Sequence, residues 1–363
     1  MDAVVAGTQR ALFVLPSYET GGSQRVLLTL LSHVDRRRFA PELVMLDATG
    51  ALQHMVPADV PVHDLGKPRL RQAIPSLLRI LRQRRPQVIF STLGYVNLAI
   101  LGLRPLLGFG TRIVIRESNL PSQALPHLRG AAALRVGYRL LYRSADKVVA
   151  QSDRMRHELE QTFHVPPSRL ARLRNPVDVA AIRGGAIAPT RRPGPGLRLV
   201  AMGHLIHQKG YDRLLEMFAS LDADARLEIY GDGAERSALE RQAQALGIAD
   251  RVAMPGFIRD PWSSLAGADA FLMPSRWEGM PNAALEALAL GVPVIATPQA
   301  GGLEEVTAAC TPGTLTLADV GAPFVSALRA LSPRRDAGLR PSLLPGDFDL
   351  AEVIPQFERL LLP

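Results

Sequence analysis

Short apolar runs alternate along the whole chain with segments of helical spacing, and this alternation limits the possible folds more than any other feature. The runs are continuously apolar, which is typical of strands buried on both faces. The sequence therefore predicts an α/β protein with two doubly wound parallel sheets. The expected strands lie at 11–16, 41–46, 87–92, 112–117 and 147–152 in the first half, and at 197–203, 225–231, 251–256, 270–275 and 292–298 in the second.

A segment rich in Gly, Pro and Arg separates the two halves. It covers 183–196 and reads RGGAIAPTRRPGPG, the composition of an interdomain linker. We therefore expect an N-terminal domain at 1–182 and a C-terminal domain at 197–345, with a last helix at 346–363 that packs back on the N-terminal domain. Ligands of open α/β sheets bind beyond the carboxyl ends of the strands, so we expect the site in a cleft between the domains.

The charge of the chain is unevenly distributed. Residues 1–190 carry 26 Lys and Arg against 13 Asp and Glu, and residues 191–363 carry 16 against 21. A basic half indicates an anionic partner, either nucleic acid or a membrane surface. Only 5% of the residues are aromatic, and no helix-turn-helix or stacking motif is recognisable, which disfavours nucleic acid. The one cysteine, Cys310, excludes an intramolecular disulfide and favours a reducing compartment.

The sequence predicts neither a targeting signal nor a membrane-spanning segment. The first residues lack the basic region, the long apolar run and the cleavage site of a signal peptide. The most apolar long stretch, 86–103, contains Gln87, Ser91, Thr92 and Asn97, and we interpret it as a strand that runs into a helix. The sequence thus favours a cytoplasmic protein.

Two helical stretches, 77–85 and 128–146, place Arg among Leu and Tyr. In the second stretch Arg135, Arg139 and Arg143 recur every four residues, so they share one face of the expected helix. Such a face is either solvated or bound to an anionic membrane surface. Both interpretations stay open from the sequence alone, so we expect a cytoplasmic protein that is either fully solvated or peripheral on the inner face of the plasma membrane.

The most specific stretch for chemistry is 276–296, where a strand ends in a Gly-Pro turn and a helix follows. Asn282 is a good N-cap for that helix. Glu286 lies four residues further on among apolar neighbours, and the helix carries no basic residue to neutralise it. A ligand hydroxyl could satisfy this carboxylate, and the backbone amides of Gly279 to Asn282 suit a phosphate. A solvent-facing Glu on an ordinary helix is the alternative.

The segment from Glu278 to Glu286 resembles the E-x7-E signature of family 4 retaining glycosyltransferases, which have the GT-B fold of two facing Rossmann-like domains. Six other segments are similar to that family in the same order and spacing, so the resemblance covers most of the chain. They lie at 12–31, 144–152, 174–179, 201–215, 229–233 and 292–306.

The resemblance implies a role for each matching residue. Glu278 reaches the donor sugar or the leaving group, Lys209 neutralises the diphosphate, and Glu286 binds the ribose hydroxyls of a nucleotide-sugar. A fixed cation fits this chemistry because a departing nucleoside diphosphate develops negative charge. The catalytic candidates are Glu278, Lys209 and Asn119. The donor-binding candidates are Gly21, Gly22, Gly203, His204, Lys209, Ile258, Gly279, Met280, Pro281, Asn282 and Glu286.

The chain departs from the family pattern at two positions. His204 stands where the family usually has an Arg. The first-domain loop that often carries a His reads RESNLP at 116–121, and Asn119 is the residue that we carry over from it. Asp222-Ala223-Asp224 matches a metal-binding motif of a different glycosyltransferase fold, but it precedes a strand, so we interpret it as a loop and expect neither a metal ion nor a cofactor.

The resemblance implies a retaining, metal-independent, hexosyltransferase-type enzyme of cell-surface polysaccharide or lipopolysaccharide assembly. It would take a nucleotide-diphospho-sugar, with UDP favoured, and transfer the sugar to a lipid-linked or glycan acceptor beside an anionic membrane surface. Another GT-B enzyme, such as a sugar-nucleotide epimerase, is the alternative, and a basic nucleic-acid-binding protein is a weaker one. A phosphorylase is disfavoured because no Lys follows Lys209 to hold pyridoxal phosphate.

Overall fold

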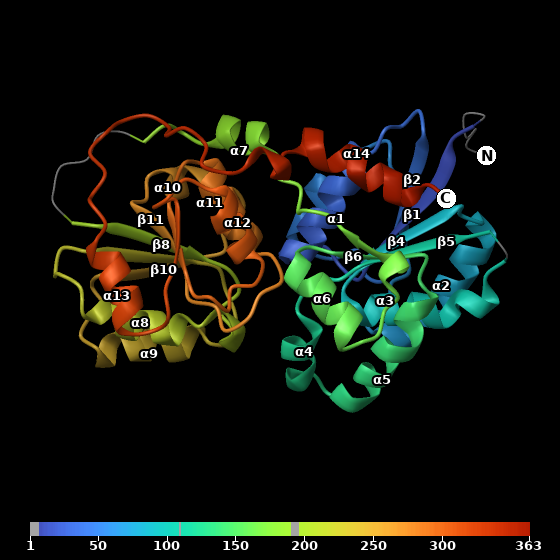
Figure 1. Ribbon diagram of the computed structural model, residues 1–363, viewed down its shortest axis with the longest axis horizontal. Coiled ribbons are helices and arrows are strands. Elements are labelled where there is room, and N and C mark those ends of the chain that lie inside the picture. Colours follow the sequence, from blue (N-terminus) through green and yellow to red (C-terminus); the bar gives the residue numbers. More distant parts are fainter. Residues whose placement is uncertain (1–6, 109, 190–195) are drawn as a thin grey trace. The chain divides into compact units, whose positions relative to one another are not determined.

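The computed structural model describes residues 7–108, 110–189 and 196–363, and these divide into two compact units. The first unit contains Met1–Pro176 and Ala351–Pro363, and the second contains Val177–Leu350. Each unit is built on one parallel sheet with helices on both faces (Figure 1). We describe each unit by itself.

The sheet of the first unit has seven parallel strands in the order β3-β2-β1-β4-β5-β6-β7. Their continuous apolar stretches place most side chains of the central strands in the core, which is typical of a sheet covered on both faces. The strands are β1 (Gln9–Leu15), β2 (Phe39–Met45), β3 (Val62–Asp64), β4 (Val88–Thr92), β5 (Arg112–Arg116), β6 (Lys147–Ala150) and β7 (Leu170–Arg172).

Two groups of helices cover the two faces of this sheet (Figure 1). On one face, α1 (Gly22–His33) and α14 (Leu350–Leu361) pack on Phe13 and Phe90. On the other face lie α2 (Leu70–Arg84), α3 (Gly94–Leu103), α5 (Ala131–Leu141) and α6 (Asp153–Gln161). The short helix α4 (Pro121–Ala124) follows the loop after β5.

Helix α14 completes the core of the first unit although it lies at the far end of the sequence. The Phe357 ring lies 4.8 Å from the Phe90 ring and 6.1 Å from the Phe13 ring, measured between centroids. The carboxylate of Glu358 accepts a hydrogen bond from the Asp35 amide (2.8 Å) and pairs with Arg38 (2.5 Å). A helix whose aromatic and acidic side chains are buried in this way is an integral layer of the unit.

The sheet of the second unit has six parallel strands in the order β10-β9-β8-β11-β12-β13. The helices α8 (Tyr211–Ala219), α9 (Arg236–Ala245) and α13 (Ala322–Arg329) cover one face, and α7 (Val179–Gly185), α10 (Trp262–Ala266), α11 (Asn282–Ala289) and α12 (Leu303–Ala309) pack on the other. The strands are β8 (Arg198–Met202), β9 (Arg226–Tyr230), β10 (Val252–Gly256), β11 (Ala270–Met273), β12 (Val294–Ala296) and β13 (Leu315–Leu317).

The boundary between the units differs from the expected one. The first unit ends at Pro176 rather than at residue 182, because α7 packs on α11 within the second unit. Residues 183–185 of the expected linker are the last turn of α7, and Arg183 donates hydrogen bonds to the carbonyls of Ala289 (3.0 Å) and Arg340 (2.9 Å). Residues 190–195 of that linker lie outside the described residues.

Candidate active site

The sequence-predicted donor residues of the second unit gather at one edge of its sheet. Because all six strands are parallel, the loops after β8, β9, β10, β11 and β12 leave the sheet at the same edge. The loop 203–210 follows β8, the loop 274–281 follows β11, and strand β11 pairs directly with β8. The two loops that carry Lys209 and Glu278 are therefore neighbours.

Lys209 and Glu278 form an ion pair at this edge. The Lys209 Nζ atom lies 2.6 Å from Oε1 of Glu278, and the two side chains are 18% and 9% exposed. Ser275 donates a further hydrogen bond to the same carboxylate (2.8 Å). The ion pair thus fixes the Lys209 ammonium at the carboxyl edge of the sheet, while the Glu278 carboxylate is almost completely buried.

Glycines bring the backbone of the neighbouring loops close together. Gly231, directly after β9, has a φ of +131°, and a Cβ atom there would lie 2.0 Å from the carbonyl oxygen of Gly203. The amide of Gly203 donates to the Tyr230 carbonyl (2.9 Å). Only glycine at position 231 allows the two backbones to approach this closely. Because position 203 is also a glycine, the loop after β8 exposes its backbone at this edge with no side chain there.

Helix α11 follows the Glu278 loop and carries the second glutamate. The helix begins at Asn282 itself with Pro281 as its N-cap, so the prediction of Asn282 as the N-cap is wrong by one position. Glu286 is 9% exposed, as expected, but it already has an interaction within the chain. A partner from outside the chain is therefore not required, and the binding of a ligand hydroxyl by Glu286 stays a prediction.

The remaining donor candidates of the second unit lie at the same edge. Met280 and Pro281 are buried in the turn before α11, and Gly279 accepts a hydrogen bond from the Gly302 amide (2.8 Å) after β12. His204 is exposed in the loop after β8. Ile258 follows β10 and is 38% exposed.

Three predicted site residues belong to the first unit. Gly21 is the N-cap of α1 and Gly22 is its first residue. Asn119 lies three residues after β5, where its buried Oδ1 atom accepts no hydrogen bond from the described part of the chain. All three follow the carboxyl ends of strands in their own sheet.

A buried network beside Asn119 was not predicted from the sequence. The Glu117 carboxylate accepts hydrogen bonds from the hydroxyls of Tyr142 (2.6 Å) and Tyr138 (3.0 Å), whose rings stack at 4.3 Å. Burial raises the pKa of Glu117, although these hydrogen bonds favour its charged form. The two tyrosines are four residues apart, the spacing of one helix face, and this is the signal that could have indicated the cluster. In the structure Tyr138 lies on α5, and Tyr142 begins the short 3₁₀ helix that follows.

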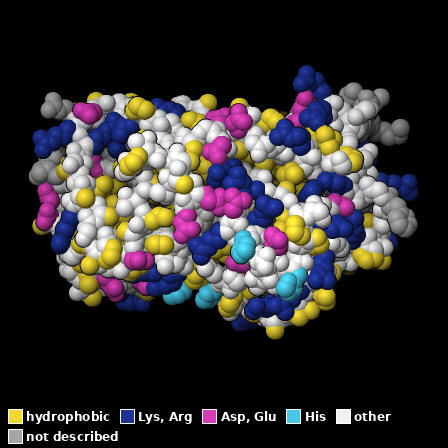
Figure 2. Space-filling view, in the orientation of Figure 1, with side chains coloured by type: hydrophobic (Ala, Val, Ile, Leu, Met, Phe, Trp, Pro, Cys, Tyr) yellow, Lys and Arg dark blue, Asp and Glu magenta, His cyan; other side chains and the backbone are white. Residues whose placement is uncertain are grey.

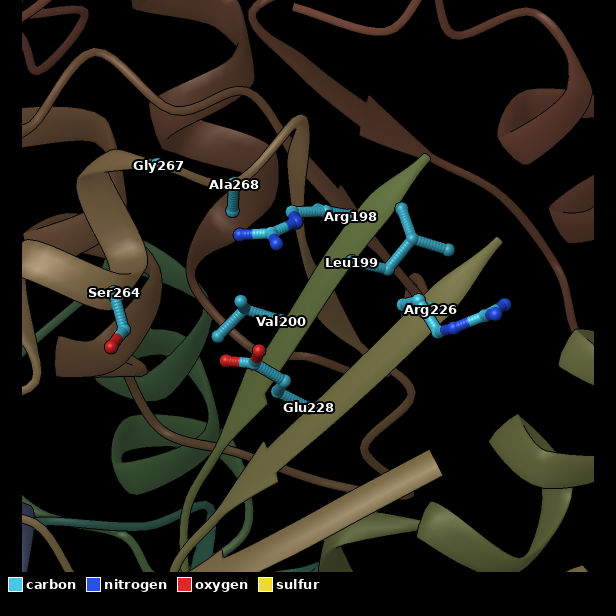
Figure 3. A pocket seen from close by; sticks show the side chains of 8 residues that line it. All are labelled: Arg198, Leu199, Val200, Arg226, Glu228, Ser264, Gly267 and Ala268. Atoms are coloured by element: carbon cyan, nitrogen blue, oxygen red, sulfur yellow. The ribbon is translucent and has the colours of Figure 1, made fainter. Parts of the chain in front are cut away.

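A pocket of the second unit lies away from this edge. Two of its lining residues, Arg198 and Arg226, are the first residues of β8 and β9, so the pocket opens near the amino ends of these strands (Figure 3). Glu228 points into it from β9, and Ser264 faces it from α10 (Figure 3). The pocket is therefore at the opposite end of these strands from Lys209 and Glu278.

Asp222 and Asp224 lie in the turn before β9, at the amino end of that strand, in agreement with their interpretation as a loop. Among residues 7–108, 110–189 and 196–363, no group of three or more His, Cys, Asp or Glu side chains is placed to hold a metal ion. In the same part of the chain, no helix combines the length and the apolar composition that crossing a bilayer requires.

Both units are Rossmann-like, with one parallel sheet each, and the second unit fixes a cationic side chain at the carboxyl edge of its sheet. Residues 187–317 match the family described as Glycosyl transferases group 1, and residues 20–181 match Glycosyltransferase Family 4. Together the two matches span most of the chain. The chain belongs to the family 4-like glycosyltransferases of GT-B fold.

Curated relatives extend this similarity. The chain is 25% identical over 301 residues to a Campylobacter jejuni N-acetylgalactosamine-N,N'-diacetylbacillosaminyl-diphospho-undecaprenol 4-alpha-N-acetylgalactosaminyltransferase, a match that covers 80% of this chain and 81% of the relative. It is 23% identical over 243 residues to an uncharacterized glycosyltransferase of Methanocaldococcus jannaschii, which covers 63% of this chain and 60% of that protein's length.

Solved structures share the fold at low sequence identity. The lipopolysaccharide outer core galactosyltransferase WaaB in its apo form is 20% identical, with a TM-score of 0.70 over 97% of this chain and 98% of that one. Anabaena HepE in complex with UDP and glucose is 18% identical, with a TM-score of 0.73 over 97% and 99%. These structures support the GT-B architecture of both units.

Proposed function

We propose that the protein is a retaining, metal-independent glycosyltransferase that takes a UDP-sugar. The observation that carries the proposal is the Lys209–Glu278 pair, 2.6 Å apart at the carboxyl edge of the second sheet. A fixed ammonium at this edge can neutralise a diphosphate, and the charge on the leaving diphosphate grows as the glycosidic bond breaks. The acceptor is a lipid-linked or glycan molecule of cell-surface polysaccharide assembly.

In this proposal the second unit binds the donor. Lys209 neutralises the diphosphate, Glu278 faces the donor sugar, and Glu286 binds the ribose. The backbone of the 279–281 turn, which precedes the eight-residue helix α11, holds sugar hydroxyls and phosphate. The enzyme provides no nucleophile in this scheme. Its contribution is orientation of the two substrates and electrostatic stabilisation of the leaving group.

The names of relatives support the choice of substrates. HepE of Anabaena, which shares the fold, was solved with UDP and glucose. The Campylobacter relative carries diphospho-undecaprenol in the name of its acceptor, and WaaB is named for the lipopolysaccharide outer core. A UDP donor and a lipid-linked acceptor are the simplest substrates in keeping with these names.

Helix α5 suits an anionic membrane surface. Its exposed side chains include Arg135 and Arg139, and they alternate with Val136 (54% exposed) and Leu140 (62% exposed). Lys and Arg side chains lie beside hydrophobic ones over this helix (Figure 2). Arginines that surround exposed aliphatic side chains are typical of helices that lie in the membrane interface. We therefore include peripheral attachment to the inner face of the plasma membrane in the proposal.

The experiment that tests the proposal combines binding and turnover. Thermal unfolding in the presence of UDP, GDP, ADP, CMP and dTDP identifies the donor base, because a ligand at 100 times its Kd stabilises the folded state by about 2.7 kcal/mol. The preferred donor is then incubated with an undecaprenyl-diphosphate-linked acceptor, and NMR of the product gives the anomeric configuration. A product of inverted configuration, or no response to any nucleotide, would overturn the proposal.

A further inference from the structure

The two loops that carry Lys209 and Glu278 need a fixed separation. They leave different strands, β8 and β11, and the residues are 69 positions apart in the chain. The ion pair between them cannot maintain this separation during the proposed reaction, because a bound diphosphate competes with Glu278 for the same ammonium. Another contact must hold the loops when the donor is present.

Arg276, two residues before Glu278, makes such a contact. Its guanidinium binds both carboxylate oxygens of Asp212, at 2.8 and 2.6 Å, and also donates to the carbonyl of His207 (2.8 Å). Its backbone amide donates to the carbonyl of Gln208 (2.7 Å). One residue of the Glu278 loop thus binds the chain on both sides of Lys209, and the bidentate pair adds directional specificity.

Further contacts join the same two segments. Arg213 donates to the Pro274 carbonyl through Nε (2.8 Å) and Nη2 (2.6 Å). Gly210 has a φ of +69°, and a Cβ atom there would lie 2.2 Å from the Pro274 carbonyl oxygen. The Gln208 side chain donates to the Trp277 carbonyl (2.9 Å). The two backbones are therefore in direct contact around the Lys209–Glu278 pair.

We propose that Arg276 and Asp212 are positioning residues that set the distance between Lys209 and Glu278. The inference rests on the proposed function, since it assigns the pair to the donor site. Neither side chain needs to contact the donor. Hydrogen bonds from Arg276 lower the pKa of Asp212, which keeps the carboxylate charged and the pair intact at neutral pH.

The test replaces Arg276 by Lys and by Gln, and Asp212 by Asn. A Lys keeps the charge but cannot form the planar fork. We therefore expect R276K, R276Q and D212N each to weaken UDP binding about tenfold or more in calorimetry and to lower kcat at saturating donor. We expect the R276Q/D212N double variant to be no worse than either single variant, because the residues act as one unit.

The ion pair between Arg36 and Asp59 in the first unit is a matched control. Its N–O distance is 2.7 Å, and Arg36 also donates to two backbone carbonyls, those of Leu31 and Val34. R36K and D59N should leave UDP affinity and kcat unchanged. A general effect of losing an arginine ion pair would affect both sets of variants equally.

The outcomes separate this inference from the proposed function. If the wild-type protein binds no nucleotide and transfers no sugar, the proposed function fails. If the wild-type protein is active and R276K equals it in UDP affinity and kcat, the positioning role is wrong. If only the melting temperature of the Arg276 variants falls while UDP affinity and kcat at a permissive temperature stay unchanged, the pair is merely structural and the inference is overturned as well.

Discussion

The ammonium of Lys209 lies 2.6 Å from Oε1 of Glu278, and Ser275 donates to that same oxygen from 2.8 Å. One carboxylate oxygen thus accepts two hydrogen bonds within one unit, and the ammonium lies at the edge of the sheet. This geometry places a cation where a leaving diphosphate would need one, and it makes Lys209 the first residue to test.

Replacing Lys209 by Ala should lower kcat by about 10²–10³, because a fixed charge that acts on the transition state is lost. Steady-state kinetics at saturating donor measures the effect. Lys147→Ala is the control, since Lys147 also donates one hydrogen bond, to the Ser168 carbonyl (2.8 Å), but lies in the first unit. Equal losses in the two variants would contradict a specific role for Lys209.

Replacing Glu286 by Ala should weaken nucleotide binding by about 1.5–3 kcal/mol, the range for a hydrogen bond to a charged group. The family resemblance carries this expectation, since Glu286 already has an interaction within the chain. Calorimetric titration with UDP measures it. Glu358→Ala removes another buried glutamate, in the first unit, and should reduce stability without changing UDP affinity. Unchanged affinity in Glu286→Ala would exclude the ribose-binding role.

Turnover should survive EDTA. Asp222 and Asp224 lie in a turn at the amino end of β9, whereas the ligands of an open α/β sheet bind at the carboxyl ends. The double variant D222N/D224N should therefore retain nearly all activity. Activity that disappears with EDTA and returns with Mn²⁺ or Mg²⁺ would show that the reaction requires a metal.

Changing Arg135, Arg139 and Arg143 to Gln should weaken binding to anionic liposomes. Each basic residue near such a surface contributes about 1 kcal/mol, and the attraction fades as salt shortens the Debye length to about 3 Å at 1 M. Co-sedimentation at two salt concentrations measures it. Three exposed arginines of the second unit, changed to Gln together, provide the control: Arg241, Arg329 and Arg335. Equal binding to neutral and anionic liposomes, or none to either, would mean that Arg135 and Arg139 of α5, and Arg143 in the short 3₁₀ helix after it, only face solvent.

Glu42 should make the first unit sensitive to acid. Burial opposes its ionisation, but hydrogen bonds from Arg84 and His63 outweigh burial and hold its pKa below the ordinary value of 4.5. A lowered folded-state pKa contributes stability above the unfolded-state pKa, and this contribution is lost as the pH falls through the folded-state pKa. Glu42→Gln should therefore cost about 3 kcal/mol of unfolding free energy at pH 7, and less below pH 4.5.

Urea unfolding of wild type and Glu42→Gln at pH 7 and in acid checks this prediction. Glu352→Gln, on the exposed face of α14, should behave like wild type at both pH values. A difference between wild type and Glu42→Gln that stays constant with pH would mean that the charge of Glu42 is not what stabilises the unit.

The central strands could be predicted because they are buried on both faces and leave continuous apolar runs. Strand β12 has only three residues but lies within the apolar stretch 292–296, which made it predictable. Strands β3, β7 and β13 could not be predicted, since each is an equally short segment that contains a polar or charged residue and leaves no continuous apolar run. The same limit explains the boundary at Pro176. Helix α7 has seven residues, including two glycines at its end, so its composition resembles that of a linker.

The site was predictable only in part, for a related reason. Lys209 and Glu278 follow apolar strands and match a family pattern, so the sequence points to them. The Arg276–Asp212 contact joins residues 64 positions apart and depends on how two loops meet. The hydrogen bonds from the two tyrosines to Glu117 likewise form only because the chain after β5 folds back and brings α5 beside that strand's end. Neither the Arg276–Asp212 contact nor the hydrogen bonding of the tyrosines to Glu117 can therefore be predicted from residue spacing along the chain.

The position of α14 in the first unit has a consequence for how the chain matures. During synthesis from the amino terminus, residues 177–350 of the second unit leave the ribosome as one continuous block and can fold at once. Phe13 and Phe90 lack their packing partner Phe357 for much longer, since Phe357 is synthesised more than 250 residues after Phe90. The first unit is therefore synthesised before the second but completes its core after it. The sheet face that carries Phe13 and Phe90 stays accessible to chaperones until α14 has been synthesised.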